Sequence, residues 1–339
     1  MEKVTTIQTI GSLSPFDLTT KQTNYGIGID VGKEEMVASC RSSNGLRSFN
    51  QISFPNNSIG LKKFLGYMEK NELSKATPIL LESTGPYHWQ IAYLLSQKEL
   101  NVKIVNPLHT KQVLRYSIRK RKTDKVDADH LAMLAYQGYG YPFKDTPDLA
   151  KLKALVRHYW SLKKQRANNI RHERYLKQYR NINKFGISGF IDRQIKTTGE
   201  EILKHFKGND LRYLDSIPGI TPILAATILA ELYPLERFSR VEQIIALAGL
   251  DPQIKQSGGK MARFGKLSKR GSPNLRRALY YAAFGSFSKK PFNKYYQRYK
   301  GRGIHHTAIL CILSRKILRV CWALLKKRRV FDEQYLDRT

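Results

Sequence analysis

The sequence predicts an α/β domain followed by a mainly helical remainder, and two observations carry this expectation. Short apolar or alternating segments, typical of strands, take turns with helical patterns over about the first 145 residues. From Pro147 onward the strand signal disappears, and apolar residues recur at helical spacing. The charge divides in a similar way: residues 1–100 hold 10 Lys and Arg against 9 Asp and Glu, and residues 101–339 hold 49 against 18.

The first domain is expected to cover residues 24–145, after a flexible polar tail over residues 1–23. Strands are predicted over residues 25–30, 36–40, 47–54, 79–81 and 102–105. Helices are predicted over residues 59–71 and 86–95 and from Pro107 onward. Because the segment 79–81 is wholly apolar, we expect it to be a central strand that is covered on both faces.

The remainder is expected to begin with a long helix. Thr146 suits the N-cap, Pro147 suits the first helical position, and an apolar stripe continues towards Tyr179. We interpret residues 146–207 as a helical or coiled-coil spacer that separates two domains or pairs with a second subunit. Three glycines are expected to punctuate its second half: Gly186, Gly189 and Gly199.

Residues 208–330 are expected to form a C-terminal helical domain, followed by a tail over residues 331–339. Its segment Leu214–Pro222 contains a Gly-Ile-Thr-Pro turn between two helical stretches. This arrangement resembles a helix-hairpin-helix element, in which backbone N–H groups of the turn bind a phosphate. An ordinary packed helix–turn–helix unit fits the same residues equally well.

The net charge of +32 and the pI of about 10.0 indicate a polyanionic partner, and nucleic acid is the first candidate. A membrane is disfavoured, because the longest apolar run, Ile220–Leu232, is 13 residues and a spanning helix needs about 20. No signal-peptide pattern is visible, and three scattered cysteines predict no disulfide framework. We therefore expect a cytoplasmic protein.

Four carboxylates have a placement that favours a metal site. Asp30 ends the first strand and Glu82 follows a buried strand, and ligands of open α/β sheets bind at such strand ends. Asp124 and Asp127 are three residues apart, so on a helix they share a face. A cation would relieve the repulsion among the four acids, and oxygen ligands favour Mg²⁺ or Mn²⁺.

Each of these acids alone also fits a turn or cap position. Asp129, on the same segment, is expected on another helix face. The Asp-x-Gly pattern after the first strand also fits the phosphate loop of actin-like kinases, but the later glycine–threonine loops of that class are missing from the sequence.

A second constellation is a serine in a glycine-rich basic loop. Ser257 precedes Gly258 and Gly259, which allow a close backbone approach to a ligand. A serine there could attack phosphorus, although an ordinary loop hydroxyl fits as well, and Ser268 and Ser272 compete for the role. The basic residues expected to contact nucleic acid are Lys33, Arg119, Lys120, Arg121, Lys122, Lys260, Arg263, Lys266, Lys269, Arg270, Arg276 and Arg277.

These segments, in this order, resemble a known family. The pieces that carry the resemblance are Gly28–Lys33, Leu81–Gly85, Lys122–Ala128, Ile217–Ile220, Ala248–Pro252, Ser257–Gly258, Ser268–Gly271 and Leu275–Arg277. The chain resembles insertion-sequence transposases that join a RuvC-like (ribonuclease H-like) DEDD domain to a C-terminal serine domain, also called bridge-RNA-guided recombinases. The resemblance spans residues 25–285 approximately, and the two tails match nothing that defines the family.

The resemblance implies that Asp30, Glu82, Asp124 and Asp127 coordinate Mg²⁺ and that Ser257 forms a phosphoserine link to DNA. It also implies recombination of double-stranded donor and target DNA, a structured guide RNA from the flank of the element, and assembly as dimers and tetramers. A location at the nucleoid of a prokaryotic cell is implied by the same resemblance. The alternatives are a DEDD nuclease or junction resolvase that uses water, a site-specific DNA invertase, and a non-catalytic nucleic-acid-binding protein.

Overall fold

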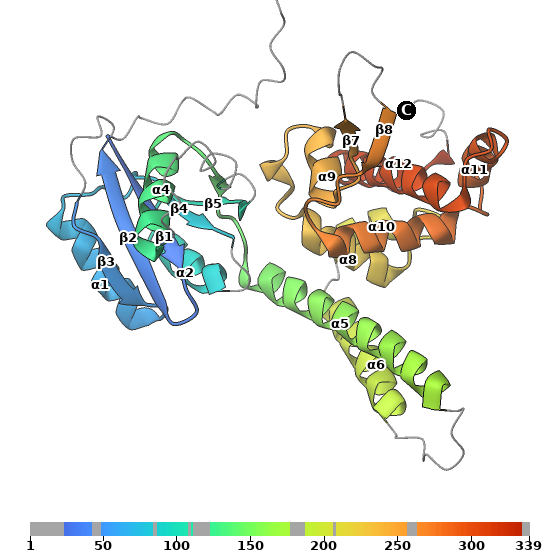
Figure 1. The fold of residues 1–339 in the computed structure, drawn as a ribbon, viewed down its shortest axis with the longest axis horizontal. Coiled ribbons are helices and arrows are strands. Elements are labelled where there is room, and N and C mark those ends of the chain that lie inside the picture. Colours follow the sequence, from blue (N-terminus) through green and yellow to red (C-terminus); the bar gives the residue numbers. More distant parts are fainter. Residues whose placement is uncertain are drawn as a thin grey trace, which may run out of the picture. The chain divides into compact units, whose positions relative to one another are not determined.

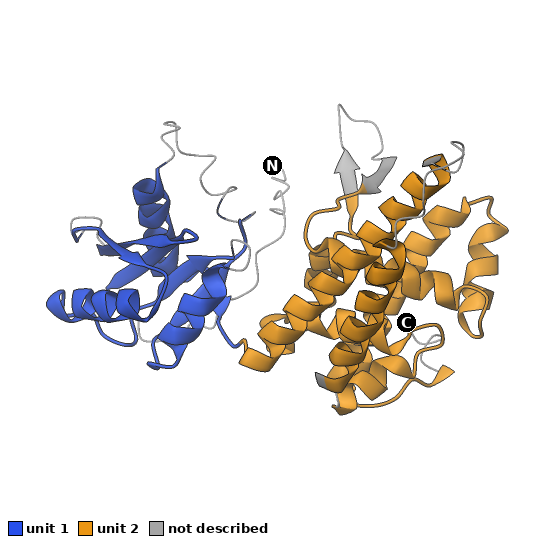
Figure 2. Ribbon diagram, turned by 90° about the horizontal axis from the view of Figure 1, so that it is seen from below, with its two compact units in different colours: residues 1–144 blue, residues 145–339 orange. Residues whose placement is uncertain are grey.

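The computed structural model describes residues 24–42, 49–83, 87–107, 110, 123–176, 187–205, 208–255 and 263–333. The chain divides into two compact units, residues 1–144 and residues 145–339 (Figure 2). The first unit is an α/β layer structure, and the second is mostly helical (Figure 1).

The first unit is built on a six-stranded mixed sheet. Its strands are β1 (Tyr25–Val31), β2 (Glu35–Ser42), β3 (Ile52–Pro55), β4 (Ile79–Glu82), β5 (Val102–Val105) and β6 (Tyr141–Pro142), in the order β3-β2-β1-β4-β5-β6. Strands β1, β2 and β3 pair antiparallel, whereas β4 and β5 run parallel to β1. The order β3-β2-β1-β4-β5 and these directions are those of the ribonuclease H-like fold, to which RuvC-like domains belong, and β6 adds a short antiparallel strand beside β5. The expected α/β class is therefore confirmed.

Two details of the sheet differ from the sequence expectation. Strand β3 begins at Ile52 rather than residue 47, and residues 43–48 lie outside the described part of the chain. The short edge strand β6 was not expected, because two residues carry no periodicity that could reveal a strand. Most of the helix expected from Pro107 also lies outside the described residues.

Helices cover both faces of this sheet. On one face, α1 (Ser58–Lys70) and α2 (Tyr87–Ser96) pack in one apolar cluster with Ile27 and Ile29 of β1. On the other face lies α4 (Asp124–Tyr136), whose Leu131 and Leu134 form a separate cluster with Leu80 of β4. Because side chains alternate along a strand, the even-numbered residues of β1 and β4 face α4.

Two glycines let α4 lie directly on β1. A Cβ added at Gly28 would lie 2.2 Å from the Ala128 carbonyl oxygen, and one added at Gly26 would lie 2.4 Å from the Tyr136 nitrogen. Moving back along β1 from Gly28 to Gly26 therefore moves forward along α4, so the helix runs antiparallel to the strand. The N-terminal turn of α4 lies towards the end of β1 that carries Asp30.

The second unit is a helical bundle with one hairpin. Its elements are α5 (Pro147–Leu176), α6 (Ile187–His205), α7 (Asn209–Asp215), α8 (Pro222–Leu232), the 3₁₀ turn η1 (Leu235–Arg237), α9 (Val241–Ala248), β7 (Pro252–Lys255), β8 (Arg263–Leu267), α10 (Pro273–Ser286), α11 (Phe292–Lys300) and α12 (His306–Lys327). One apolar cluster joins α5 and α8 with α10 and α12. None of the helices in the described residues is long and apolar enough to cross a bilayer.

The second unit corrects two sequence expectations. The antiparallel pair β7–β8 shows that strands do not end at residue 147, although each strand is too short for a clear pattern. Helix α6 also continues through Gly189 and Gly199 without interruption. A Cβ at Gly199 would lie 3.6 Å from the Tyr159 ring of α5, an ordinary van der Waals distance, so Gly199 lies where α6 contacts α5.

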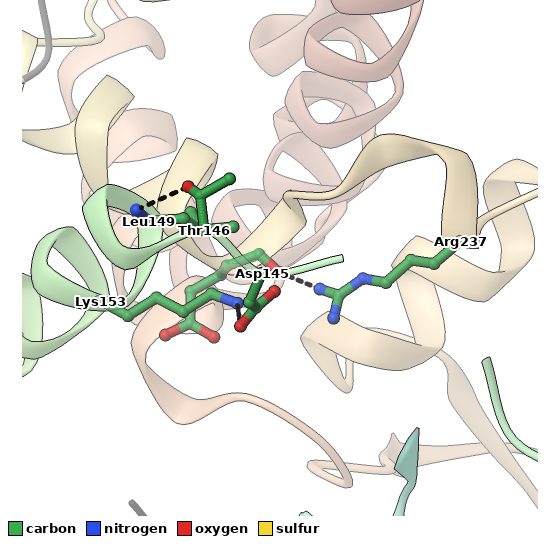
Figure 3. Close-up of polar contacts among 6 residues, drawn as sticks. Asp145, Thr146, Leu149, Lys153 and Arg237 are labelled. Atoms are coloured by element: carbon green, nitrogen blue, oxygen red, sulfur yellow. Dashed lines mark hydrogen bonds and ion pairs between the residues drawn. The ribbon is translucent and has the colours of Figure 1, made fainter. Parts of the chain in front are cut away.

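The start of α5 follows the sequence expectation. The Leu149 N–H donates to the Thr146 hydroxyl (3.2 Å), and Pro147 is the first helical residue. A largely buried ion pair between Asp145 Oδ2 and Lys153 Nζ (2.8 Å) secures this turn (Figure 3). Burial is the main cause that lowers the Lys153 pKa, while Asp145 opposes the shift. Arg237 lies beside this pair, and its Nη2 donates to the Glu231 carbonyl (2.5 Å).

The Leu214–Pro222 segment joins α7 to α8 through a tight turn. Gly219 has φ of +97°, and its Cα side packs against the backbone of Gly285 in α10. The Ser286 hydroxyl donates to the Pro218 carbonyl (2.6 Å), which fastens the turn to the same helix. These contacts account for the turn as part of the helical core, so the phosphate-binding interpretation stays a prediction.

Candidate active site

The alternation along β1 decides where Asp30 lies. Gly26, Gly28 and Asp30 share the face that α4 covers, and the two glycines bring the helix close. The sequence Gly-x-Gly-x-Asp thus serves two purposes, because it admits α4 and then presents a carboxyl group beside its first turn. That turn carries Asp124 and Asp127, and the Val126 N–H donates to the Thr123 hydroxyl (3.3 Å) at the N-cap.

Glu82 reaches the same region from the neighbouring strand. Strand β4 pairs parallel with β1, with Gly28 opposite Leu80 and Ile29 opposite Leu81. Leu80 faces α4, so Glu82, two residues further along, points to the same side. The Thr110 hydroxyl donates to Glu82 Oε2 (2.8 Å), which orients this carboxylate.

The electrostatics of Asp30 show that the four acids gather. Its pKa is raised from 3.8 to about 6, first by burial and then by the negative charges of Asp124, Asp127 and Glu82. A hydrogen bond from the Val31 backbone opposes the shift. Like charges raise the pKa of a carboxyl group only when they are near it. The four acids that the sequence singled out are therefore brought together by the fold.

This donor set suits a hard divalent cation, because it consists of carboxylate oxygens. Within the described residues, however, no group of three or more His, Cys, Asp or Glu side chains lies close enough to share one ion. The raised pKa of Asp30 and the lack of a group of three close ligands in the described part of the chain are compatible, because charges interact over longer distances than the length of a metal–oxygen bond. The carboxylates thus converge on one region of the first unit.

A second face of α4 is fixed by contacts that the sequence reasoning missed. Asp129 Oδ1 pairs with Arg41 Nε (3.1 Å) and accepts a hydrogen bond from the Ser39 hydroxyl (3.3 Å). Both partners are on β2, so Asp129 ties α4 to the sheet. Asp129 thus lies on a different face from Asp124 and Asp127, as its spacing suggested. Only the β2–α4 packing reveals its partners.

The predicted nucleophile, Ser257, lies outside the described residues, as does Lys260. The base of its loop is described: β7 and β8 pair, and beyond them the Ser268 hydroxyl donates to Asp251 Oδ1 (2.5 Å). Ser272 is the N-cap of α10, and its hydroxyl accepts from the Leu275 N–H (3.1 Å). The two competing serines therefore have structural hydrogen bonds.

The predicted nucleic-acid contacts fall into several groups. Residues Arg119, Lys120, Arg121 and Lys122 lie outside the described part of the chain, and only the backbone of Arg263 and Lys266 is described. Lys33 is exposed beside Glu34, and Lys269 and Arg270 are exposed after β8. Two others have partners in the fold: Arg276 Nη1 donates to the Ala248 carbonyl (2.9 Å), and the Arg277 guanidinium lies 5.5 Å from the centre of the Trp160 ring.

The first unit thus joins a ribonuclease H-like sheet to four acids that gather near the end of β1. A sequence model described as "Transposase" matches residues 27–180, and a model described as "Transposase IS116/IS110/IS902 family" matches residues 211–297. Between them the two matches take in both units of the chain. The chain belongs to the IS110/IS116 family of DEDD transposases, which are enzymes that cut and transfer DNA strands.

Curated relatives agree with this assignment. A pilin gene-inverting protein of Moraxella bovis is 28% identical over 91% of this chain and 98% of its own length. The corresponding protein of Moraxella lacunata is 27% identical over the same shares. The uncharacterized 44.8 kDa protein of insertion element IS116 from Streptomyces clavuligerus is 29% identical over 42% of this chain and 36% of its own length.

Among solved structures, a RuvC chain has a weak similarity to this protein. The chain described as "T. thermophilus RuvC in complex with Holliday junction substrate" is 12% identical, with a TM-score of 0.27. The match covers 36% of this chain and all of that one. The fold assignment above rests on the strand order and directions of the sheet, not on this similarity.

Proposed function

We propose that this protein is a metal-dependent DNA recombinase in which Asp30, Glu82, Asp124 and Asp127 hold Mg²⁺ or Mn²⁺. The observation that carries the proposal is the gathering of three further carboxylates around Asp30, whose pKa is raised to about 6 first by burial and then by these negative charges. Crowded, partly buried carboxylates are costly unless a cation or a proton compensates them. A divalent ion bound there would supply charge stabilisation for a reaction at phosphorus.

The Ser257 hydroxyl is proposed as the nucleophile. Its Oγ forms a bond to a DNA phosphorus, the bond from that phosphorus to a deoxyribose oxygen breaks, and that oxygen leaves with a proton. The serine proton passes to a carboxylate or to water, so a phosphoserine link holds the DNA until a new strand end reverses the reaction. Supporting this choice, Ser268 and Ser272 already serve the fold through Asp251 and the α10 N-cap.

Two outcomes fit such chemistry, transposition and site-specific inversion. The relatives aligned over 91% of this chain are described as gene-inverting, whereas the insertion-element proteins IS116, IS900 and IS110 align over 36–42% of it. Inversion is therefore the second candidate function. It needs the same residues and differs in the arrangement of the two DNA sites, so a plasmid with sites in inverted orientation separates the two.

The same proposal includes two partners. A structured RNA encoded beside the gene would pair with donor and target DNA, and dimers or tetramers would bring the acids of one subunit to the serine of another. The net charge of +32 supports binding of more than one nucleic-acid strand. The acids lie in the first unit and the serine loop in the second, which leaves room for a site shared between subunits.

A trapping assay tests the chemistry. The intact protein is incubated with Mg²⁺, candidate donor and target DNA, and RNA from the flanking sequence, and a denaturing gel is examined for protein that carries DNA. We expect a covalent band that is lost in Ser257→Ala and in Asp124→Ala, and kept in Ser288→Ala, an exposed serine of the second unit.

Other outcomes select the alternatives. Cleaved DNA without an adduct, unchanged in Ser257→Ala, would leave a DEDD nuclease that uses water. Binding without any cleavage, equal in the wild type and Asp124→Ala, would indicate a non-catalytic nucleic-acid-binding protein. Unchanged activity when the RNA is omitted would remove the guide RNA from the proposal.

A further inference from the structure

Helix α10 presents an exposed aromatic stripe that the cleavage chemistry does not use. Tyr281 is 49% exposed and Phe284 is 54% exposed, which is unusual for side chains of this size. They are three residues apart, so they lie on one face of the helix, and Arg277 precedes Tyr281 by one turn on that face. We refer to Arg277, Tyr281 and Phe284 as the α10 stripe.

The stripe rests on a rigid base. The Tyr281 ring lies nearly parallel to the Trp160 ring of α5, with an interplanar angle of 3° and 5.7 Å between centroids. Trp160 is only 6% exposed, and its Nε1–H donates to the Thr227 hydroxyl (3.1 Å). Trp160 is therefore fixed by burial and by a hydrogen bond, and it holds Tyr281 in an offset stack.

The Tyr281 ring has the Trp160 ring stacked on it and the Tyr280 ring beside it, 6.3 Å between centroids and inclined by 72°. Trp160 contacts the interior, whereas about half of the Tyr281 surface remains open to solvent. A preoriented ring loses little conformational entropy when a planar ligand stacks on it. The chemistry of the stripe thus fits a flat aromatic group that carries negative charge nearby.

The positive charge around the α10 stripe indicates which class of ligand it would bind. The Arg277 guanidinium lies 5.5 Å from the Trp160 centroid, next to the stack. Residues 252–331, which include all of α10, contain 21 Lys and Arg and no Asp or Glu. A partner whose aromatic rings are joined by phosphates satisfies both features. In a duplex the faces of the bases are covered by their neighbours, so only an unpaired strand offers them.

We propose that the α10 stripe stacks unpaired bases of single-stranded DNA. This inference rests on the proposed function, because strands that are cut and rejoined to new partners must leave their old ones, which exposes their bases. The inference assigns a DNA-binding surface to the second unit, in addition to the acids proposed for catalysis in the first unit. Aromatic stacking tolerates any base, so the α10 stripe would bind a single strand without sequence specificity.

The probe is a single-stranded oligo-dT that carries one 2-aminopurine, whose fluorescence is quenched when the base stacks. Binding to the intact protein is measured in EDTA, where a metal-dependent reaction cannot run. Removing one stacking ring weakens binding by about 5- to 150-fold, so we expect Tyr281→Ala to lose affinity in this range together with the quench. Tyr281→Phe keeps the ring face and should bind like the wild type.

Three further measurements make the test specific. Tyr281→Leu keeps apolar bulk without an aromatic ring, so it should fold and still lose the quench. Tyr175→Ala removes another exposed aromatic ring, 58% exposed near the far end of α5, and should bind normally. The slope of log K against log salt should be unchanged in Tyr281→Ala, because no charge is removed, and shallower in Arg277→Gln.

Several results would overturn the proposal. Normal binding and quenching by Tyr281→Ala, while DNA cleavage still depends on Asp30, would reject the α10 stripe and leave the proposed function standing. Loss of self-association in Tyr281→Ala by sedimentation, with unchanged DNA binding, would show that a second copy covers the stripe. A Tyr281-dependent quench with an RNA strand of the same sequence, and none with DNA, would also reject it.

Discussion

The two units of this chain place their charges by different means. Residues 1–144 hold 19 Lys and Arg against 12 Asp and Glu, and four of these acids gather near the end of β1 and the first turn of α4. Residues 145–339 hold 40 Lys and Arg against 15 Asp and Glu, spread along helices and loops. Like charges that are crowded together repel each other, so close packing of the surrounding elements is needed to hold them. Like charges that are spread over a surface add little repulsive free energy. The charges proposed for catalysis therefore depend on the fold in detail, whereas the charges proposed for binding depend mostly on composition.

The largest expected effect tests the crowded acids directly. Asp30→Asn keeps the shape of the side chain and removes its charge, so we expect strand cleavage to fall by about 10²- to 10³-fold. Glu34→Gln is the matched control, since Glu34 is an exposed acid just beyond the same strand. Cleavage rates of a labelled duplex give the comparison, and equal losses in both variants would remove the special role of the sheet edge.

The second prediction concerns the packing that holds the acids. A Cβ at Gly28 would meet the α4 backbone at 2.2 Å, so Gly28→Ala should lower the free energy of unfolding by about 1–3 kcal/mol and impair cleavage. Gly66→Ala in α1 is the control, because a Cβ there meets nothing within 4 Å and should stabilise the helix by about 0.5–1 kcal/mol. Denaturant titration measures both. Similar values for the two variants would contradict the close docking of α4.

The third prediction follows from the Asp30 pKa, which is about 6 in the folded protein against 3.8 for a free side chain. Because the folded state binds this proton more tightly, the contribution of Asp30 to stability is most favourable at low pH and is lost as the pH rises from about 4 to above 6. Asp30→Asn removes this dependence. In EDTA, the melting temperature of the wild type relative to the variant should therefore fall by a few degrees between pH 5 and pH 7.5.

At pH 7.5, adding a divalent ion should raise the melting temperature of the wild type relative to that of Asp30→Asn. Mg²⁺ would stabilise the wild type by binding the ionised acids and would have little effect on Asp30→Asn. A wild-type advantage that grows with pH in EDTA would contradict the crowding of the carboxylates. An equal response of both proteins to Mg²⁺ would place the ion elsewhere.

The smallest effect tests the spread charge of the second unit. Lys269 is exposed after β8, and if it contacts one phosphate, Lys269→Gln should make the slope of log K against log salt shallower by about 0.9 for duplex DNA. Lys62→Gln, an exposed lysine of α1 in the first unit, should leave the slope unchanged. Fluorescence anisotropy at several salt concentrations measures both. Equal slopes for all three proteins would show that Lys269 contacts no phosphate.

Much of the first unit was predictable because its segments carry strong local signals. The apolar run at Ile79–Leu81 is the core of β4, and the Thr146–Pro147 pair begins α5 as expected. Weak signals were missed: β6 has two residues, and β7 and β8 have four and five. Such strands form because partners are available in the fold, and a partner leaves no trace in the local pattern.

The candidate site divides in the same way. The spacing of Asp124 and Asp127 gave their shared helix face, and strand ends gave Asp30 and Glu82. The partners of Asp129 on β2 and the stack of Tyr281 on Trp160 join residues that are 88 or more positions apart. Such contacts follow from packing, so no periodicity in the sequence could indicate them.

By itself, the sequence determined how charge is divided between the two parts of the chain, the α/β and helical classes, and which four acids are candidates. These features can be read from composition and from the spacing of residues that are close together in the chain. Only the tertiary structure decided that α4 runs antiparallel to β1 over Gly26 and Gly28, which brings its acidic first turn to Asp30. The physical reason is that a pKa responds to charges close in space, and closeness between distant segments is set by which faces pack together.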